Sequence, residues 1–346
     1  MKIKVMRLLA ALGVTFVSPG AFALEQAGFF ELPLPTQMGT GSPFFSYNSA
    51  GATPTWFKPT GTTGVYEVTF ANLGTSSSAN GAGGDVQAVA HEPFKHCNPK
   101  SWGTSGTSLK VTVVCFDRFG NQSDTKFVTA FRRMVTPVDQ PSGYLRAYLW
   151  SQFEGPSTSA PAFYSFNSMG GTNTVEWTGT GSYRVRLPQM VSGANGGTVM
   201  VSAYGTSGVS MRYCKVAGWF GSGVPGELEV DVNCFDSSGM PANSRFTLSY
   251  GLTSFDKVGS AAFAWADQPT APSYTPDTFY QRDILSTNAD PGNYSTTALS
   301  GTLTIDKTGT ASYRVNVPNL NATGTTNVLV TSYGFEDSNF CWIDSW

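Results

Sequence analysis

The chain has 346 residues and a formal net charge of −2, and only 13% of its residues are charged. Nucleic-acid-binding proteins usually present a basic patch, so this composition argues against nucleic acid as a partner. Globular domains usually contain about 25% charged residues. Ser, Thr, Asn, Gln and Gly must therefore cover much of the surface, as is common in extracellular β proteins.

The N-terminus predicts a secretory signal peptide over residues 1–23. Basic residues precede an apolar run at 8–17, and Ala21-Phe22-Ala23 is the small-x-small pattern that signal peptidase cleaves, here after Ala23. The apolar run is too short for a membrane-spanning helix, which needs about 20 residues. We expect a secreted protein, extracellular or periplasmic, with no membrane span. An N-terminal membrane anchor is the alternative.

An internal repeat of about 117 residues follows the signal peptide. A Cys-x4-Trp pattern occurs three times, and each copy also carries a Tyr-x-Val strand shortly after a Thr-Gly-Thr turn. The three Cys-x4-Trp pairs are Cys97 with Trp102, Cys214 with Trp219, and Cys341 with Trp346. We place β-repeat 1 at 27–145, β-repeat 2 at 146–261 and an incomplete β-repeat 3 at 262–346.

The third copy stops before its counterpart of the Cys-Phe-Asp strand, which begins at Cys115 and Cys234 in the other two copies. Either the chain is a fragment ending inside repeat 3, or the missing strands are supplied from elsewhere. In both cases Cys341 lacks the partner that the other copies have.

Period-2 alternation of apolar and polar residues dominates the chain, for example over 110–115, 183–187 and 227–232. Gly, Ser, Asn and Pro clusters separate these runs, which predicts an all-β fold of tandem antiparallel repeats. Each copy divides into two faintly similar halves with about four short strands each, which suits a β-propeller with four-stranded units. The alternative is a string of β-sandwich domains. We favour the propeller because a ring accounts for three copies.

The cysteines predict two disulfides, Cys97–Cys115 and Cys214–Cys234, at matching positions of repeats 1 and 2. Export to an oxidising compartment favours such bonds, and closing loops of this length contributes about 3 kcal/mol in the chain-entropy model. We expect Cys341 to be unpaired. A zinc site is the weaker alternative because the chain has only two histidines.

No catalytic, cofactor or metal motif is recognisable in the sequence. His91 and His96 are the only histidines and do not recur, so we interpret them as surface residues rather than as members of a catalytic triad. The Asp-x-x-Gly segments at Asp117 and Asp236 suit a hairpin turn better than a calcium loop. We predict no catalytic residue, no metal and no cofactor.

Aromatic residues are abundant, and most of those that recur are expected to pack inside the repeats. Trp56, Tyr274 and Tyr280 do not recur and are our candidate ligand contacts. Exposed aromatic rings stack on the faces of sugars, which makes carbohydrate a candidate ligand.

The linked pattern runs from Tyr-Asn-Ser through Thr-Gly-Thr-x-x-Tyr-x-Val and Cys-x4-Trp to Val-x-Val-x-Cys-Phe-Asp. It resembles repeats of uncharacterised secreted bacterial β proteins and covers nearly all of the mature chain. The resemblance implies export and a β repeat, and it implies no activity.

Three functions fit these observations. The first is a secreted non-enzymatic repeat protein that presents binding surfaces for polysaccharide or other cell-surface ligands. The second is a structural or adhesive extracellular protein whose repeats contact a cell-surface protein. The third is a secreted hydrolase with an unrecognised site. A hydrolase would fail after one substitution such as His91→Ala, whereas a repeated binder would lose affinity stepwise.

Overall fold

A computed structural model gives the structure of most of the chain beyond the predicted signal peptide, which lies outside the described residues. The structure describes residues 25–35, 38–41, 45–74, 83–134, 145–156, 164–191, 196–205, 211–251, 259–286, 296–297, 301–319, 327–335 and 337–346. Over these ranges no helix is long and apolar enough to cross a membrane.

The fold is all-β, as predicted, and its sheets are antiparallel. Repeat 1 forms a four-stranded sheet in the order β3-β1-β9-β6 and a five-stranded sheet in the order β2-β4-β5-β8-β7. The strands are β1 (Glu25–Leu32), β2 (Met38–Thr40), β3 (Ser46–Asn48), β4 (Thr55–Phe57), β5 (Val65–Phe70), β6 (Asp85–Ala90), β7 (Lys95–Ser105), β8 (Ser108–Asp117) and β9 (Phe127–Met134).

The two sheets of repeat 1 pack face to face as a β-sandwich. Phe30 and Phe131 from the first sheet and Tyr66 and Val111 from the second are at most 1% exposed and belong to one apolar cluster. The alternating sequence of β8 explains the packing, because every second side chain of a strand points to the same face.

Repeat 2 repeats this sandwich with sheets in the orders β11-β10-β17-β14 and β12-β13-β16-β15. Leu149 and Leu248 of one sheet pack with Val185 and Val230 of the other in a single buried cluster. The strands are β10 (Arg146–Ser151), β11 (Ser165–Asn167), β12 (Thr174–Gly179), β13 (Ser182–Leu187), β14 (Thr198–Tyr204), β15 (Arg212–Gly221), β16 (Leu228–Asp236) and β17 (Arg245–Gly251).

Repeat 3 forms two three-stranded sheets, in the orders β18-β20-β21 and β19-β22-β23. The elements are β18 (Gly259–Ala264), β19 (Ser273–Tyr274), the 3-10 helix η2 (Thr278–Tyr280), β20 (Gln281–Ser286), β21 (Thr296–Thr297), β22 (Thr304–Gly309) and β23 (Ser312–Asn316). The segments 327–335 and 337–346 follow in extended form, outside these sheets.

The architecture is therefore the predicted alternative, the β-sandwich, rather than the propeller. Each sheet of repeat 2 takes strands from both halves of the copy, so a half-copy is not a structural unit. A propeller blade would need four consecutive strands in one sheet.

Equivalent hydrogen bonds join neighbouring repeats. At the first junction Gly205 N of repeat 2 donates to Pro99 O of β7 at 3.0 Å, and at the second Gly334 N donates to Val216 O of β15 at 2.9 Å. Pro99 and Val216 each lie two residues after the cysteine of their Cys-x4-Trp pair. The two junctions therefore have the same geometry.

The C-terminal segment joins repeat 3 to repeat 1 in the same manner. Ile343 N donates to Ala90 O of β6 at 2.9 Å, just as Val216 N donates to Ser332 O at 3.1 Å. Ile343 lies two residues after Cys341, so it occupies in repeat 3 the position that Val216 occupies in repeat 2. The three repeats thus close into a ring.

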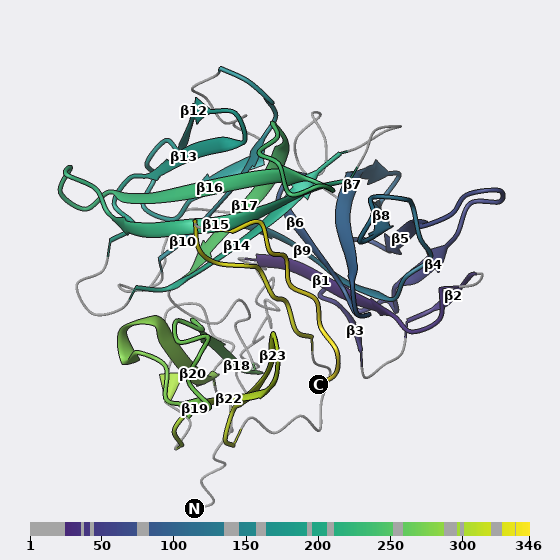
Figure 1. Cartoon of the computed structure of the whole chain (residues 1–346). Coiled ribbons are helices and arrows are strands. Elements are labelled where there is room, and N and C mark those ends of the chain that lie inside the picture. Colours follow the sequence, from purple (N-terminus) through teal and green to yellow (C-terminus); the bar gives the residue numbers. More distant parts are fainter. Residues whose placement is uncertain are drawn as a thin grey trace, which may run out of the picture.

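Equivalent side chains meet in the middle of this ring. His96, Tyr213 and Phe340 each precede the cysteine of a Cys-x4-Trp pair. Their ring centroids lie 5.8, 5.6 and 5.4 Å apart in the three pairings. An approximate threefold arrangement of the repeats requires that these three equivalent side chains contact one another. Figure 1 shows three lobes with the C-terminal segment between them.

Candidate functional site

The recurring aromatic residues build the junctions between repeats. At the first junction Trp102 packs edge to face on its three neighbours, with ring centroids 6.1, 5.3 and 5.2 Å away. Those neighbours are Trp150, Tyr164 and Tyr204. Trp219 makes the same contacts at the second junction with Trp265, Tyr280 and Tyr333. Because each ring packs on others from the neighbouring repeat, these residues stabilise the contact between repeats.

The third junction has a different composition. Trp346 occupies the tryptophan position and contacts His91 at 4.7 Å and Phe45 at 5.9 Å between ring centroids. His91 Nδ1 lies 2.8 Å from Glu31 Oε1, and its Nε2 lies 3.1 Å from Asp344 O. Both imidazole nitrogens therefore have partners. Through these contacts His91 helps to hold repeat 3 against repeat 1.

The three predicted ligand contacts lie apart from one another. Trp56 is only 8% exposed and packs in the core of the first sandwich. Tyr280 belongs to the second aromatic junction, and Tyr274 is half-buried and accepts a hydrogen bond from Gln268 N at 3.3 Å. The structure does not bring these residues together into one surface.

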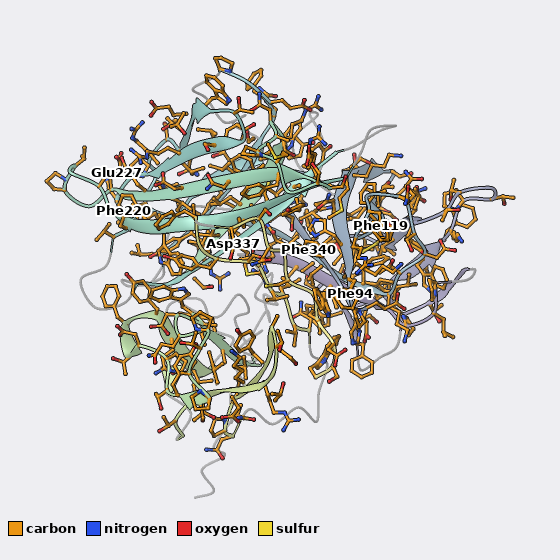
Figure 2. All side chains as sticks on the ribbon, viewed as in Figure 1. Phe94, Phe119, Phe220, Glu227, Asp337 and Phe340 are labelled. Carbon is orange, nitrogen blue, oxygen red and sulfur yellow. A yellow bond between two sulfur atoms is a disulfide. The ribbon has the colours of Figure 1, made fainter. Side chains whose placement is uncertain are left out.

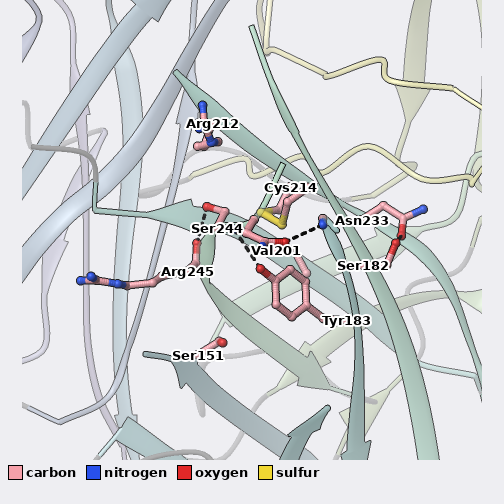
Figure 3. Close-up of a disulfide and its surroundings, with 12 residues drawn as sticks. Ser151, Ser182, Tyr183, Val201, Arg212, Cys214, Asn233, Ser244 and Arg245 are labelled. Atoms are coloured by element: carbon pink, nitrogen blue, oxygen red, sulfur yellow. Dashed lines mark hydrogen bonds between the residues drawn. A yellow bond between two sulfur atoms is a disulfide. The ribbon is translucent and has the colours of Figure 1, made fainter. Parts of the chain in front are cut away.

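Both predicted disulfides are present, between Cys97 and Cys115 and between Cys214 and Cys234. Each joins directly opposite residues of two neighbouring strands, β7 with β8 and β15 with β16. In Figure 3, Tyr183 lies beside the second disulfide and accepts a hydrogen bond from Ser244 N at 2.9 Å. Cys341 is a free, exposed cysteine.

The Asp-x-x-Gly segments form hairpin turns. Asp117 Oδ1 accepts hydrogen bonds from Phe119 N at 2.9 Å and Asn121 N at 3.0 Å. Asp236 accepts the equivalent bonds from Ser238 N and Met240 N. A bond from the Ser238 side chain, together with these two backbone bonds, holds the pKa of Asp236 below its ordinary value. Among the described residues no three His, Cys, Asp or Glu side chains gather as metal ligands.

The third repeat has an open sheet edge that the other two repeats lack. Tyr313 and Val315 of β23 are 41% and 51% exposed. Their equivalents in repeat 2, Tyr183 and Val185, are 2% and 0% exposed. The difference arises because β16 pairs with the outer edge of β13, whereas no described strand pairs with that edge of β23.

An exposed aromatic face forms where two loops of repeat 1 meet the C-terminal segment. Phe94 is 55% exposed and has a φ of 58°, a left-handed conformation that bulky side chains rarely adopt. The guanidinium carbon of Arg118 lies 5.9 Å from the Phe94 ring centroid and 4.6 Å from that of Phe119. Trp342 contacts Phe94 at 5.1 Å. We call these four residues the Phe94 face.

Figure 2 shows Phe94, Phe119 and Phe340 near one another on the side of the molecule where the C-terminal segment runs. Sequence reasoning missed this face because its aromatic residues come from two loops of repeat 1 and from the end of repeat 3. The signal that could have found it is divergence: Met211 and Ser338 occupy the Phe94 position in the other copies.

Comparisons with known proteins add no name to this site. No family model matches the chain, and no match was found among curated proteins or among solved structures either.

Proposed function

We propose that this chain is a secreted, non-enzymatic protein that binds an extracellular ligand, with carbohydrate on a polysaccharide or cell surface as the first candidate. Two buried disulfides fit an oxidising compartment. Together with the predicted signal peptide, they support export to the periplasm or the cell exterior.

The observation that carries the proposal is the Phe94 face. A bulky residue that is 55% exposed and held at a positive φ is costly to maintain, and such outliers concentrate at functional sites. Phe94 and Phe119 offer flat apolar surfaces on which a sugar ring can stack. The Arg118 guanidinium between them supplies hydrogen-bond donors for hydroxyl or carboxylate groups.

The contacts of the two histidines favour binding over hydrolysis. His91 is engaged through both ring nitrogens, and His96 Nε2 lies 2.7 Å from Asn98 Oδ1 while its ring packs on Tyr213 and Phe340. Neither histidine approaches a serine or cysteine in a described hydrogen bond, as a nucleophile–base pair requires.

The test is a binding screen of the secreted protein against polysaccharides and cell-wall fractions. We expect saturable binding that free sugar competes, and at least a tenfold loss of affinity in Phe94→Ala. Phe57→Ala is the matched control, because Phe57 is exposed on β4 and lies outside the Phe94 face. Equal affinities of the two variants would contradict the proposed site.

A structural or adhesive role is the second candidate, and the open edge of β23 favours it. An unpaired strand edge with exposed apolar side chains is a template for pairing with another polypeptide. Binding to protein components of the cell wall that free sugar does not compete would support this role.

A further inference from the structure

We propose that the third repeat binds a β-hairpin supplied from outside residues 1–346, whose two strands take the places that β16 and β17 occupy in repeat 2. This inference rests on the adhesive role proposed above. The turn of the bound hairpin would cover the Phe94 face, so hairpin binding and carbohydrate binding there would exclude each other.

The first strand of the hairpin has a defined position. In repeat 2, β16 lies between β13 and β15. β23 is the counterpart of β13, because both pair with the preceding strand through the same irregularity, Trp177/Gly179 in one repeat and Lys307/Gly309 in the other. The segment 339–346 is the counterpart of β15, since it carries the third Cys-x4-Trp pair. A strand inserted here would pair with both.

The second strand would complete the other sheet. In repeat 2, β17 lies between β10 and β14. β18 is the counterpart of β10, and residues 328–333 are the counterpart of β14, with Gly334 equivalent to Gly205 at the junction hydrogen bond. Neither β18 nor residues 328–333 has a described strand on the side that β17 would take.

The exposed side chains specify the pattern of the hairpin. In repeat 2, Tyr183 and Val185 face Val232 and Val230 of β16 in the ladder and are buried with them in one core. Tyr313 and Val315 therefore need a strand with valine or a similar apolar residue at alternate positions. The sequence Val-x-Val-x-Cys-Phe-Asp of β16 meets this requirement.

The cysteine of that pattern would lie opposite Cys341, because Cys234 lies directly opposite Cys214 in the β15–β16 register. If the hairpin cysteine arrives as a mixed disulfide with glutathione, the Cys341 thiolate attacks the hairpin sulfur. One S–S bond then forms between the chains, the bond to glutathione breaks, and reduced glutathione leaves with the electron pair. Oxidised glutathione, which formed the mixed disulfide, is the oxidant.

The turn of the hairpin would lie on the Phe94 face. Gly120 of repeat 1 lies against Met211 and Ser237 of repeat 2, and Gly239 of repeat 2 lies against Ser338 of repeat 3. In repeat 1, the positions equivalent to Met211 and Ser237 are occupied by Phe94 and Arg118. In a closed ring, the turn of the added hairpin therefore lies against Phe94 and Arg118.

The probe is a synthetic peptide of residues 227–251, which spans β16 and β17 of this chain. It is added to the full secreted protein in a buffer of reduced and oxidised glutathione. Hydrogen exchange of the β23 amides is followed by mass spectrometry, and so is the disulfide-linked adduct. We expect at least tenfold slower exchange in β23 and a single adduct through Cys341.

Two controls separate strand pairing from thiol chemistry. Cys341→Ser should abolish the adduct and keep the slower exchange of β23. A peptide with Val230→Lys and Val232→Lys keeps the cysteine and should produce neither effect. Unchanged exchange of β23, or equal adduct yields from both peptides, would overturn the inference. Binding of cell-wall protein by a chain that rejects the peptide would overturn it while leaving the adhesive role in place.

Discussion

Asp85 lies buried between the first and second sandwiches, where Gln87 Nε2 donates to its two carboxylate oxygens at 3.1 and 3.2 Å. Gln87 in turn contacts Thr247 and Ser202 of repeat 2. Burial raises the pKa of Asp85 to about 7, although the bond from Gln87 and the charge of Arg132 oppose the shift.

A carboxyl group whose pKa is higher in the folded state destabilises the fold as pH rises from its ordinary pKa of 3.8 to about 7. The stability of the Asp85→Asn variant relative to the parent should therefore increase from pH 4 to pH 8, by on the order of 2–4 kcal/mol. Urea unfolding of both proteins at these two pH values measures the difference. A difference that does not change with pH would contradict the buried ionisation.

His96 shows the opposite dependence on pH. Burial, with the rings of Tyr213 and Phe340 packed against it, lowers the pKa of His96 to about 4, and the bond to Asn98 opposes the shift. A histidine with a lowered pKa in the folded state loses its stabilising contribution as pH falls from 6.5 to about 4.

His96→Phe places in repeat 1 the residue that repeat 3 has at Phe340. This variant should resist acid better than the parent, by on the order of 1–2 kcal/mol at pH 4. The expected gain is smaller than the pKa shift alone implies, because His96 is half-buried rather than fully buried. Thermal unfolding at pH 4 and pH 7 provides the measurement. Equal acid sensitivity of the two proteins would show that His96 does not titrate in this cluster.

At the scale of the element, the sequence predicted strands and disulfides well. The alternation in β8 and β16 indicates which face is buried, and the two cysteine pairs share their spacing, so both features are local. Which sheet a strand joins is a non-local property. The order β12-β13-β16-β15 places Thr174 and Asn233 in one sheet although their segments lie far apart in the chain.

The Phe94 face and the open edge of β23 were not predictable in the same way. The exposure of Tyr313 depends on a strand that would lie beside it and not on its own segment, which resembles that of Tyr183. Trp56, by contrast, was a candidate ligand contact because it does not recur. The core of the first sandwich buries it, since a non-recurring residue can also fill a local gap in packing.

The junction strands make a further prediction. Val216 N donates to Ser332 O, and the equivalent position in repeat 1 is Pro99, which has no N–H. Val216→Pro should therefore fold and cost about 1 kcal/mol, the net value of one hydrogen bond. Val232→Pro, in the central strand β16, should prevent folding of repeat 2. Equivalent losses in the two variants would contradict the account of the junction.

At the scale of the whole molecule, the C-terminal segment links repeats 2, 3 and 1. The buried Lys215 of β15 donates to Asp337 O at 3.1 Å and pairs with the Asp337 carboxylate, whose partner bonds outweigh burial and lower its pKa. Asp337→Ala would leave the Lys215 ammonium buried without its carboxylate.

We expect Asp337→Ala to lose about 1–3 kcal/mol of stability, less than for a fully buried pair because Asp337 is half exposed. The variant should also release the C-terminal segment, seen as faster proteolysis after residue 337. Asp344→Ala is the control, because the Asp344 side chain is exposed and only its backbone carbonyl contacts His91. Wild-type stability of Asp337→Ala would contradict the proposed role of this ion pair.

The closed ring of three repeats is tested most directly by residue-resolved hydrogen exchange of three junction amides. Gly205 N, Val216 N and Ile343 N donate to carbonyl oxygens of a neighbouring repeat at 3.0, 3.1 and 2.9 Å. A closed ring predicts slow exchange at all three, within about tenfold of one another. Slow exchange at Gly205 and Val216 with unprotected exchange at Ile343 would show that repeat 3 does not contact repeat 1, and that the three repeats form an open row.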